Sequence, residues 1–254
     1  MPVQLLVEMP IAGEDPEDDR RWCTLHLDGT TERLPFDDRE RILSIPGLHE
    51  HLFHELLPCR SAEAVCALLA GELDRHHVDP GTLKLLDLGA GNGMLGERMA
   101  AIGIESLVAI DVLDAAAEAA DRDRPGLYED YLVADLDELD EDDRDELRGH
   151  ELDALVTVTS LGTGEPSARA FAEAFNAIAG DGWIALNMED GPAARSDVTG
   201  LRRFVDQMIE AEVLNLHARS PYEHRRAPDD AGAPFVAIVA RKRRDLAEGE
   251  IPDA

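Results

Sequence analysis

The chain has 254 residues, of which 44% are hydrophobic, so it can bury a substantial core as one large domain, with or without an appended segment. Its 24 basic and 54 acidic residues give a formal net charge of -30, which disfavours binding to nucleic-acid backbones and to anionic lipid surfaces. No apolar run reaches the roughly 18 residues of a membrane span, and the first residues lack the basic and apolar regions of a secretory leader, so we expect a cytoplasmic protein with no membrane partner.

The excess of acidic residues has two explanations that the sequence leaves open. One is adaptation to high salt, where screening relieves the self-repulsion of an acidic protein. The other is a GC-rich genome, which favours Ala, Arg and Asp over Lys; lysine occurs only at Lys84 and Lys242. The basic run RKRR at 241–244 is typical of nucleic-acid contacts when taken alone, but four charges are a weak footprint in so acidic a chain, and we expect no nucleic-acid partner.

The sequence predicts neither disulfides nor a metal site. Cys23, Cys59 and Cys66 are an odd number without CxxC spacing, so we expect them to act as small buried hydrophobic residues. The histidine-rich stretch HEHLFHE, 49–55, misses the zinc pattern HExxH because Phe53 stands where the second histidine is required.

Residues 1–80 are predicted to form a cap of strands and helices. Asp28-Gly29 between two apolar runs is a hairpin signal, and Ser61 is a candidate N-cap. The predicted elements are strands at 3–9 and 22–27 and helices from about Asp38 to Leu57 and from Ser61 to about Arg75.

Residues 81–244 alternate regularly between short β-rich runs and helical patterns, which predicts βαβ units, a parallel sheet and helices on both of its faces. The predicted strands are 84–88, 106–111, 131–135, 152–158 and 182–188, and the predicted helices lie near 94–102, 113–121, 141–149, 166–179 and 197–212. Two strands without a helix between them follow at 213–223 and 234–243, so the last can enter the sheet antiparallel. Residues 245–254 are expected to be a disordered tail.

The stretch KLLDLGAGNG, 84–93, places three glycines within five positions directly after a strand. Glycines this dense weaken regular structure, so we infer that a ligand needs the bare backbone there. A phosphate-binding P-loop would require GxxxxGK, and no lysine follows the glycines. A dinucleotide fingerprint, GxGxxG, would require glycine where Met94 stands.

The spacing that is present, an acid followed by three alternate glycines, resembles motif I of class I S-adenosylmethionine-dependent methyltransferases. Asp87 is the acid, and Gly89, Gly91 and Gly93 are the glycines. The resemblance covers roughly residues 81–244. It implies an α/β, Rossmann-like sheet of seven mostly parallel strands in the order 3-2-1-4-5-7-6, with the last strand antiparallel, and S-adenosyl-L-methionine as cofactor.

The resemblance also implies roles for the residues of the glycine loop and of the strand that follows it. The loop, including Ala90 and Asn92, is expected to approach the methionine moiety and ribose of the cofactor, with Asp87 near the amino end. Asp111, at the end of the second strand and next to Val112, is expected to accept hydrogen bonds from both ribose hydroxyls. A second interpretation, compatible with the first, is that Asp111 caps the helix that starts near residue 113.

At the end of the third strand, Asp135 is expected to face the adenine amino group, with Leu136 beside it, although Asp135 also opens an acidic run typical of a solvated surface. The preceding GLYEDY is similar to a Gly-Leu-Tyr stretch found in a subgroup of the family. Simple packing is the other interpretation of its Tyr128 and Tyr131.

The segment at the fourth strand, VTVTSLGTGEP, lacks two catalytic patterns. One is the Asn/Asp-Pro-Pro-aromatic loop of enzymes that methylate the amino groups of adenine or glutamine. The other is the Pro-Cys nucleophile of enzymes that methylate cytosine C5. Thr159, Ser160 and Leu161 lie at the carboxyl edge of this strand, where open α/β sheets bind ligands, so they are candidates for the methyl-transfer region. Glu189 and Asp190 are similarly placed after the fifth strand, with exposed surface acids as the alternative.

The island HARSPYEHRR, 217–226, is basic within an acidic chain, and Arg219, Arg225 or Arg226 could bind a substrate carboxylate. The alternative is a loop that pairs with neighbouring acids.

Together these features predict a methyltransferase acting on an unidentified, small-molecule acceptor, with catalytic residues that the sequence does not assign. Two alternatives stay open: a non-catalytic protein that binds S-adenosylmethionine or S-adenosylhomocysteine, and a non-methylating enzyme on the same fold. Association into a homodimer also stays open.

Overall fold

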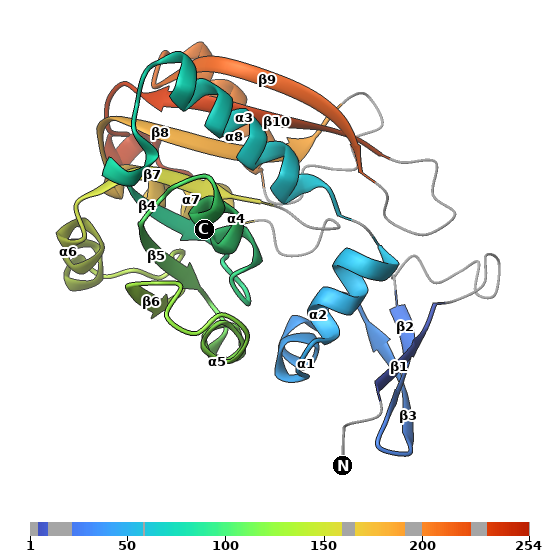
Figure 1. Cartoon of the computed structure of the whole chain (residues 1–254). Helices are drawn as coiled ribbons and strands as arrows, with labels where there is room; N and C mark the ends of the chain where they lie inside the picture. Colours follow the sequence, from blue (N-terminus) through green and yellow to red (C-terminus); the bar gives the residue numbers. More distant parts are fainter. Residues whose placement is uncertain are drawn as a thin grey trace.

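The structure, a computed structural model, describes residues 5–9, 22–57, 59–158, 166–190, 200–224 and 233–253. These residues form a small cap, which we define as β1 to η1, and a larger α/β core that begins at α3 (Figure 1). Within the described ranges, no helix combines the length and apolar character that crossing a bilayer would require.

The cap is a three-stranded antiparallel sheet packed against short helices. Its strands are β1 (Leu5–Glu8), β2 (Trp22–Leu27) and β3 (Thr30–Pro35), in the order β1-β2-β3. The predicted hairpin is confirmed: Leu27 pairs with Thr30, and the two turn residues, Asp28 and Gly29, both have positive φ.

The predicted helix from Asp38 to Leu57 is wrong as a single element. The structure divides it into α1 (Arg39–Ser44), α2 (Leu48–Glu50) and the π-helix η1 (His51–Leu56). Pro46 disfavours helical geometry at Ile45, which is extended with ψ 116°, and Gly47 is left-handed with φ 75°. The chain therefore turns between α1 and α2 and presents two separate helices to the core.

The core contains the predicted seven-stranded sheet. The order β6-β5-β4-β7-β8-β10-β9 corresponds to 3-2-1-4-5-7-6 when counted from β4, and β10 is antiparallel to both of its neighbours, as predicted. The third core strand ends two residues before Asp135 and not at it. The strands are β4 (Lys84–Leu88), β5 (Ser106–Asp111), β6 (Asp130–Val133), β7 (Leu152–Thr157), β8 (Ile178–Glu189), β9 (Leu214–His224) and β10 (Ala233–Lys242).

Helices cover both faces of this sheet. One apolar cluster joins α3 and α4 to the sheet, a second joins α6, α7 and α8 to it, and α5 packs beside β5 and β6 and against α1 of the cap. The helices are α3 (Ser61–Arg75), α4 (Met94–Ala101), α5 (Asp114–Asp123), α6 (Glu141–Gly149), α7 (Ala168–Ala177) and α8 (Leu201–Glu210), with 3-10 turns η2 (Pro80–Thr82) and η3 (Glu248–Glu250).

Helix α3, placed with the cap by the sequence, packs on β8, β9 and β10 of the core sheet. The N-cap of α3 is Arg60, so the predicted cap at Ser61 is wrong by one residue. The Ser61 hydroxyl instead accepts a hydrogen bond from the Tyr222 hydroxyl of β9, 2.9 Å away. This side-chain bond ties the first turn of α3 to the edge strand of the sheet.

The end of the chain is ordered where we expected a disordered tail. Leu246 is buried, and its backbone N–H donates to the Asn176 side chain at 2.9 Å. Arg244 donates to both carboxylate oxygens of Glu250, at 2.7 and 2.8 Å. Residues 245–253 therefore fold back against α7 and close over the core.

Lys242, one of the two lysines, is fully buried at the end of β10. Its ammonium group donates to the carbonyl oxygens of Phe175 and Ile178, at 2.8 and 2.6 Å, and pairs with Asp245 at 2.6 Å. A cation at a helix C-terminus satisfies carbonyls that have no partner within the helix, so Lys242 stabilises the end of α7.

Replacing Lys242 with Met should lower the free energy of unfolding by about 2–4 kcal/mol, because buried carbonyls lose their donor at about 1–3 kcal/mol each. Lys84→Met is the matched control, since the Lys84 side chain is 34% exposed and lies 4.0 Å from Glu129; we expect a change within about 0.5 kcal/mol. Urea unfolding of both variants measures the difference, and equal effects would contradict the role given to Lys242.

Candidate functional site

A cavity of about 100 Å³ lies between the cap and the glycine loop of the core. The cap contributes aromatic, aliphatic and histidine side chains, and the core contributes the loop between β4 and α4. The lining residues are Phe36, Arg39, Ile42, Leu43, His49, Phe53, His54, Cys59, Ala62, Gly89, Ala90, Gly91, Asn92, Met94, Leu95 and Val158. Four of the predicted cofactor-binding residues, all in the glycine loop, are therefore brought together at one cavity.

The three glycines of the loop serve two different purposes. Gly89 and Gly91 have φ of 75° and 55°, and a Cβ added to either would meet no atom within 4 Å, so these two leave open space beside the backbone. Gly93 also has a positive φ, 87°, but a Cβ there would lie 3.1 Å from the side chains of Arg124 and Leu127. Only the first two glycines thus provide bare backbone with open space beside it, whereas Gly93 allows close packing at the start of α4.

Asp87, expected near the amino end of the cofactor, is fully buried and does not line the cavity. Its Oδ2 accepts a 2.7 Å hydrogen bond from the Tyr128 hydroxyl, and burial raises the pKa of the carboxyl group to about 7. Gly96 makes this contact sterically feasible, because a Cβ there would lie 2.7 Å from the Tyr128 ring carbon Cζ. In this structure Asp87 thus anchors the segment before β6 to the end of β4.

Asp111 links three segments of the chain. Its Oδ2 accepts hydrogen bonds from the backbone N–H of Gly91 and from Nη2 of Arg39, both at 3.0 Å, and its Oδ1 accepts from the Leu113 N–H at 3.2 Å. The side chain is only 1% exposed. Asp111 thus accepts one backbone N–H just before α5, at Leu113, which agrees in part with its alternative interpretation as a helix cap. The hydrogen bond from Gly91 places the carboxylate directly beside the glycine loop.

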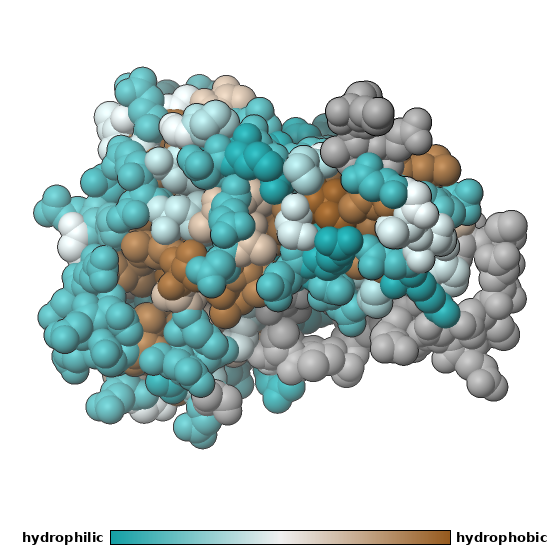
Figure 2. All heavy atoms as spheres, turned by 90° about the horizontal axis from the view of Figure 1, so that it is seen from below, coloured by the Kyte–Doolittle hydropathy of each residue, from teal (hydrophilic) through white to brown (hydrophobic). Residues whose placement is uncertain are grey.

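The other predicted adenine-side residues are divided between surface and core. Val112 is 52% exposed, and Asp135 is exposed, with its Oδ1 accepting a hydrogen bond from the Asp137 N–H at 3.0 Å. Leu136 is instead buried in the cluster under α6 and α7, so its side chain is not available to a ligand. Figure 2, which looks from below the view of Figure 1, shows a mostly hydrophilic surface with a few apolar areas.

The predicted methyl-transfer residues Thr159, Ser160 and Leu161 lie outside the described residues, as do Arg225 and Arg226. Val158, directly before this segment, lines the cavity.

The remaining predicted polar residues are not among those that line the cavity; they are Glu189, Asp190 and Arg219. Arg202 donates to the Glu189 carbonyl at 2.8 Å and lies 3.5 Å from Asp190. Arg219 lies on the edge strand β9, so the basic island begins as a strand and not as a loop.

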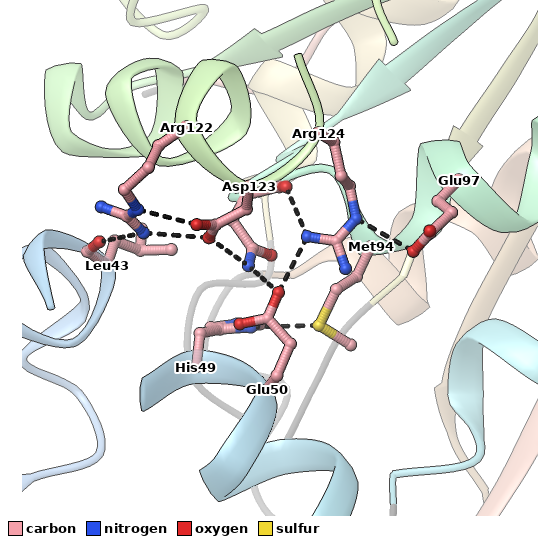
Figure 3. Close-up of polar contacts among 9 residues, drawn as sticks. Leu43, His49, Glu50, Met94, Glu97, Arg122, Asp123 and Arg124 are labelled. Carbon is pink, nitrogen blue, oxygen red and sulfur yellow. Dashed lines mark hydrogen bonds and ion pairs between the residues drawn. The ribbon is translucent and has the colours of Figure 1, made fainter. Parts of the chain in front are cut away.

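The cap is joined to the glycine loop by a network of charged and polar side chains that the sequence analysis missed (Figure 3). Arg124 donates through Nη1 to Glu50 at 2.8 Å and to the Asn92 carbonyl at 3.0 Å, and through Nε to Glu97 at 3.0 Å. The Asn92 side chain donates to Glu50 at 2.6 Å. Burial alone would raise the pKa of Glu50, but the hydrogen bond from Arg124 holds it below its usual value. Glu50 therefore stays ionised and holds α2 to the loop.

His49 and Phe53 bring an aromatic surface from the cap to the cavity. Their rings pack edge to face with centroids 4.9 Å apart, and His49 Nδ1 lies 3.2 Å from the Met94 sulfur (Figure 3). Burial lowers the pKa of His49 to about 4, so its imidazole is neutral near pH 7. A neutral, partly buried imidazole adds a ring face without a charge beside the cavity.

Tyr128 and Tyr131 do more than pack. Tyr128 hydrogen-bonds Asp87 as described, and the Tyr131 hydroxyl donates to the Gly91 carbonyl at 2.7 Å. The GLYEDY stretch was the available sequence signal for these residues. Arg39, Glu50 and Arg124 had no such signal, because isolated charges in a chain with 31% charged residues do not stand out.

Comparison with known proteins identifies the fold. No protein-family model matches the chain, and no curated protein matches it. Among solved structures, N-methyltransferase NodS from Bradyrhizobium japonicum WM9, in complex with S-adenosyl-L-homocysteine, aligns with a TM-score of 0.54 and 17% identity over 82% of this chain and 98% of that one.

Two further structures are similar at lower identity. Magnesium protoporphyrin IX methyltransferase from Synechocystis PCC 6803, with bound S-adenosylmethionine, aligns with a TM-score of 0.51 and 11% identity over 81% of this chain and 90% of that one. A proposed RNA methyltransferase from Pyrococcus horikoshii aligns with a TM-score of 0.50 and 15% identity over 73% and 85%. The chain therefore has the fold of class I S-adenosylmethionine-dependent methyltransferases, and two of these similar structures hold S-adenosyl-L-homocysteine or S-adenosyl-L-methionine.

Proposed function

We propose that the protein is an S-adenosylmethionine-dependent methyltransferase that acts on a small-molecule acceptor. The observation that carries the proposal is the pairing of open backbone at Gly89 and Gly91 with the Asp111 carboxylate, which accepts a hydrogen bond from the Gly91 N–H. Such an arrangement offers a surface for the methionine and ribose moieties and an acceptor for ribose hydroxyls. The cofactor, when bound, supplies a methyl group already activated by its sulfonium centre.

The tasks left to the chain are binding, orientation and exclusion of water. In this proposal Ala90 and Asn92 complete the loop that holds the cofactor, and Asp135, which like Val112 is exposed, contacts the adenine. A general base is required only if the acceptor arrives protonated.

A small-molecule acceptor is supported by the character of the cavity and of the surface. The cap covers the loop with Phe36, His49 and Phe53, so an acceptor must enter a partly covered space lined by aromatic and aliphatic side chains. The net charge of -30 opposes close approach of a nucleic-acid backbone.

The cap must move to admit the cofactor. The cavity of about 100 Å³ is smaller than the pockets of about 300–1,000 Å³ that hold ligands of drug-like size. Arg39 of α1 also donates to Asp111 Oδ2, the oxygen proposed for the ribose. We infer that α1 swings away when the cofactor binds and that Arg39 and the ribose compete for the same carboxylate.

Asp111→Ala should weaken cofactor binding by about 100- to 20,000-fold, because hydrogen bonds to a charged group contribute about 1.5–3 kcal/mol each and two are lost. Isothermal titration with S-adenosylmethionine measures the effect. Asp190→Ala, at the end of β8 and outside the cavity lining, is the control and should bind as the wild type does. Similar affinity in Asp111→Ala and wild type would remove the ribose assignment; a thermal melt checks that the variant folds.

Arg39→Ala should tighten cofactor binding by about 2- to 10-fold, because the ribose then no longer displaces a partly buried ion pair. Arg41→Ala is the matched control on the same helix, since Arg41 pairs with Glu32 of the cap and not with the core. Weaker binding in Arg39→Ala would mean that Arg39 contacts the cofactor-bound form instead of competing with it.

Turnover separates the proposed enzyme from the two alternatives. S-adenosylhomocysteine released only in the presence of an acceptor from a library of small molecules supports the methyltransferase. Tight cofactor binding without that product, in the small-molecule library and with RNA, would favour a binding protein or a different reaction on the same fold.

A further inference from the structure

A second cluster of potential ligands lies on the core sheet, apart from the cavity. Glu72 and His76 occupy the last turn of α3 and the residue after it, and His217 lies on the edge strand β9. His217 Nδ1 is 3.1 Å from His76 Nε2, and Glu72 Oε2 is 3.8 Å from His76 Nε2 and 4.0 Å from His217 Nδ1. Three potential donor atoms from two elements thus meet at one point.

These separations suit a metal ion. Imidazole nitrogens and carboxylate oxygens bind Zn²⁺ at about 2.0–2.2 Å, and tetrahedral geometry then places the ligand atoms about 3.3 Å from one another. The observed separations of 3.1 to 4.0 Å need only side-chain adjustments of a few tenths of an ångström at each ligand.

The environment of Glu72 is the second reason. Its side chain is only 3% exposed, and while Oε1 is paired with Arg75 Nη1 at 2.7 Å, Oε2 faces two imidazoles at separations longer than a hydrogen bond. A cation at this point would bind the carboxylate oxygen and both imidazole nitrogens together. A hydrogen bond between His76 and His217 accounts for one of the three contacts, and the two contacts of Glu72 Oε2, at 3.8 and 4.0 Å, are longer than a hydrogen bond.

The surroundings also hold the two imidazoles in place. The Trp183 ring packs edge to face against both imidazoles, with centroids 5.6 and 5.5 Å away, and restrains their orientation.

A supporting partner is also present. The Asn215 side-chain nitrogen lies 3.1 Å from His217 Nε2. When His217 binds a metal through Nδ1, its proton resides on Nε2. The Asn215 amide would then turn to accept that proton, and its oxygen would give up the hydrogen bond that it now accepts from Arg243 Nη2 at 3.2 Å.

We propose that Glu72, His76 and His217 bind one divalent transition-metal ion of the zinc type, with two imidazole nitrogens and one carboxylate oxygen as protein ligands. His76 is 39% exposed, so water can reach the ion and complete its coordination. The ion joins the end of α3 to the edge strand across 141 residues of sequence and stabilises that side of the sheet. None of the three residues lines the cavity, so this proposal is independent of the proposed methyl transfer.

Zn²⁺ titration of the untagged, chelator-treated full chain tests the site. We expect one ion per chain, a metal-dependent rise in Tm, and visible ligand-field absorption when Co²⁺ is the probe. His76→Ala and His217→Ala should each weaken Zn²⁺ binding by at least about 100-fold, since even residues that only support metal ligands typically change affinity 10- to 100-fold.

His77→Asn is the matched control. His77 neighbours His76 but lies outside the cluster, and its positive φ of 56° is one that asparagine tolerates. This variant should bind Zn²⁺ as the wild type does. Wild-type protein that binds no ion or shows no cobalt absorption would overturn the proposal, and so would retained 1:1 binding in His76→Ala or His217→Ala. Absence of cobalt absorption in the wild type overturns the proposal even if a variant fails to fold.

Discussion

The buried carboxylate of Asp111 is the contact on which the arrangement of the candidate site depends. Its two oxygens accept hydrogen bonds from the glycine loop, from the start of α5 and from α1 of the cap, so three segments distant in sequence are placed by one side chain. A carboxylate can do this because it offers several lone pairs in a plane, and burial strengthens each bond. The same group that orders the loop is therefore the one that a ribose would have to engage.

The sequence predicts the core well because its signals are local or strongly periodic. Alternating strands and helices led to the correct sheet order, and the spacing from Asp87 to Gly93 located the loop at which the cavity lies. The hairpin at Asp28-Gly29 was also predictable, since positive φ at both turn positions selects these residue types.

The missed features are those that depend on tertiary contacts. For the basic run 241–244 the sequence discounted nucleic-acid contacts but predicted no packing role, whereas Arg241 lies over the Trp183 ring and Lys242 is buried at the end of α7. Glu72 and His217 are too far apart in sequence for any spacing rule to connect them. The break after α1 was missed because helical periodicity continues across Pro46, and only the local backbone preferences at Pro46 and Gly47 oppose a helix there.

The cap has its own apolar core, and this bears on how cofactor exchange can proceed. Its buried cluster, which includes Cys23, Leu34, Phe36 and Leu52, is drawn wholly from residues before α3, whereas the apolar contact with α5 is small and centres on Leu43. A lid that is internally packed can pivot as a rigid body about a short connection, breaking few contacts and keeping its fold. In the proposed motion of the cap, admission to the cavity would depend on the ion pairs of Arg39 with Asp111 and of Glu50 with Arg124, which ionic strength weakens far more than it weakens the packing within the cap.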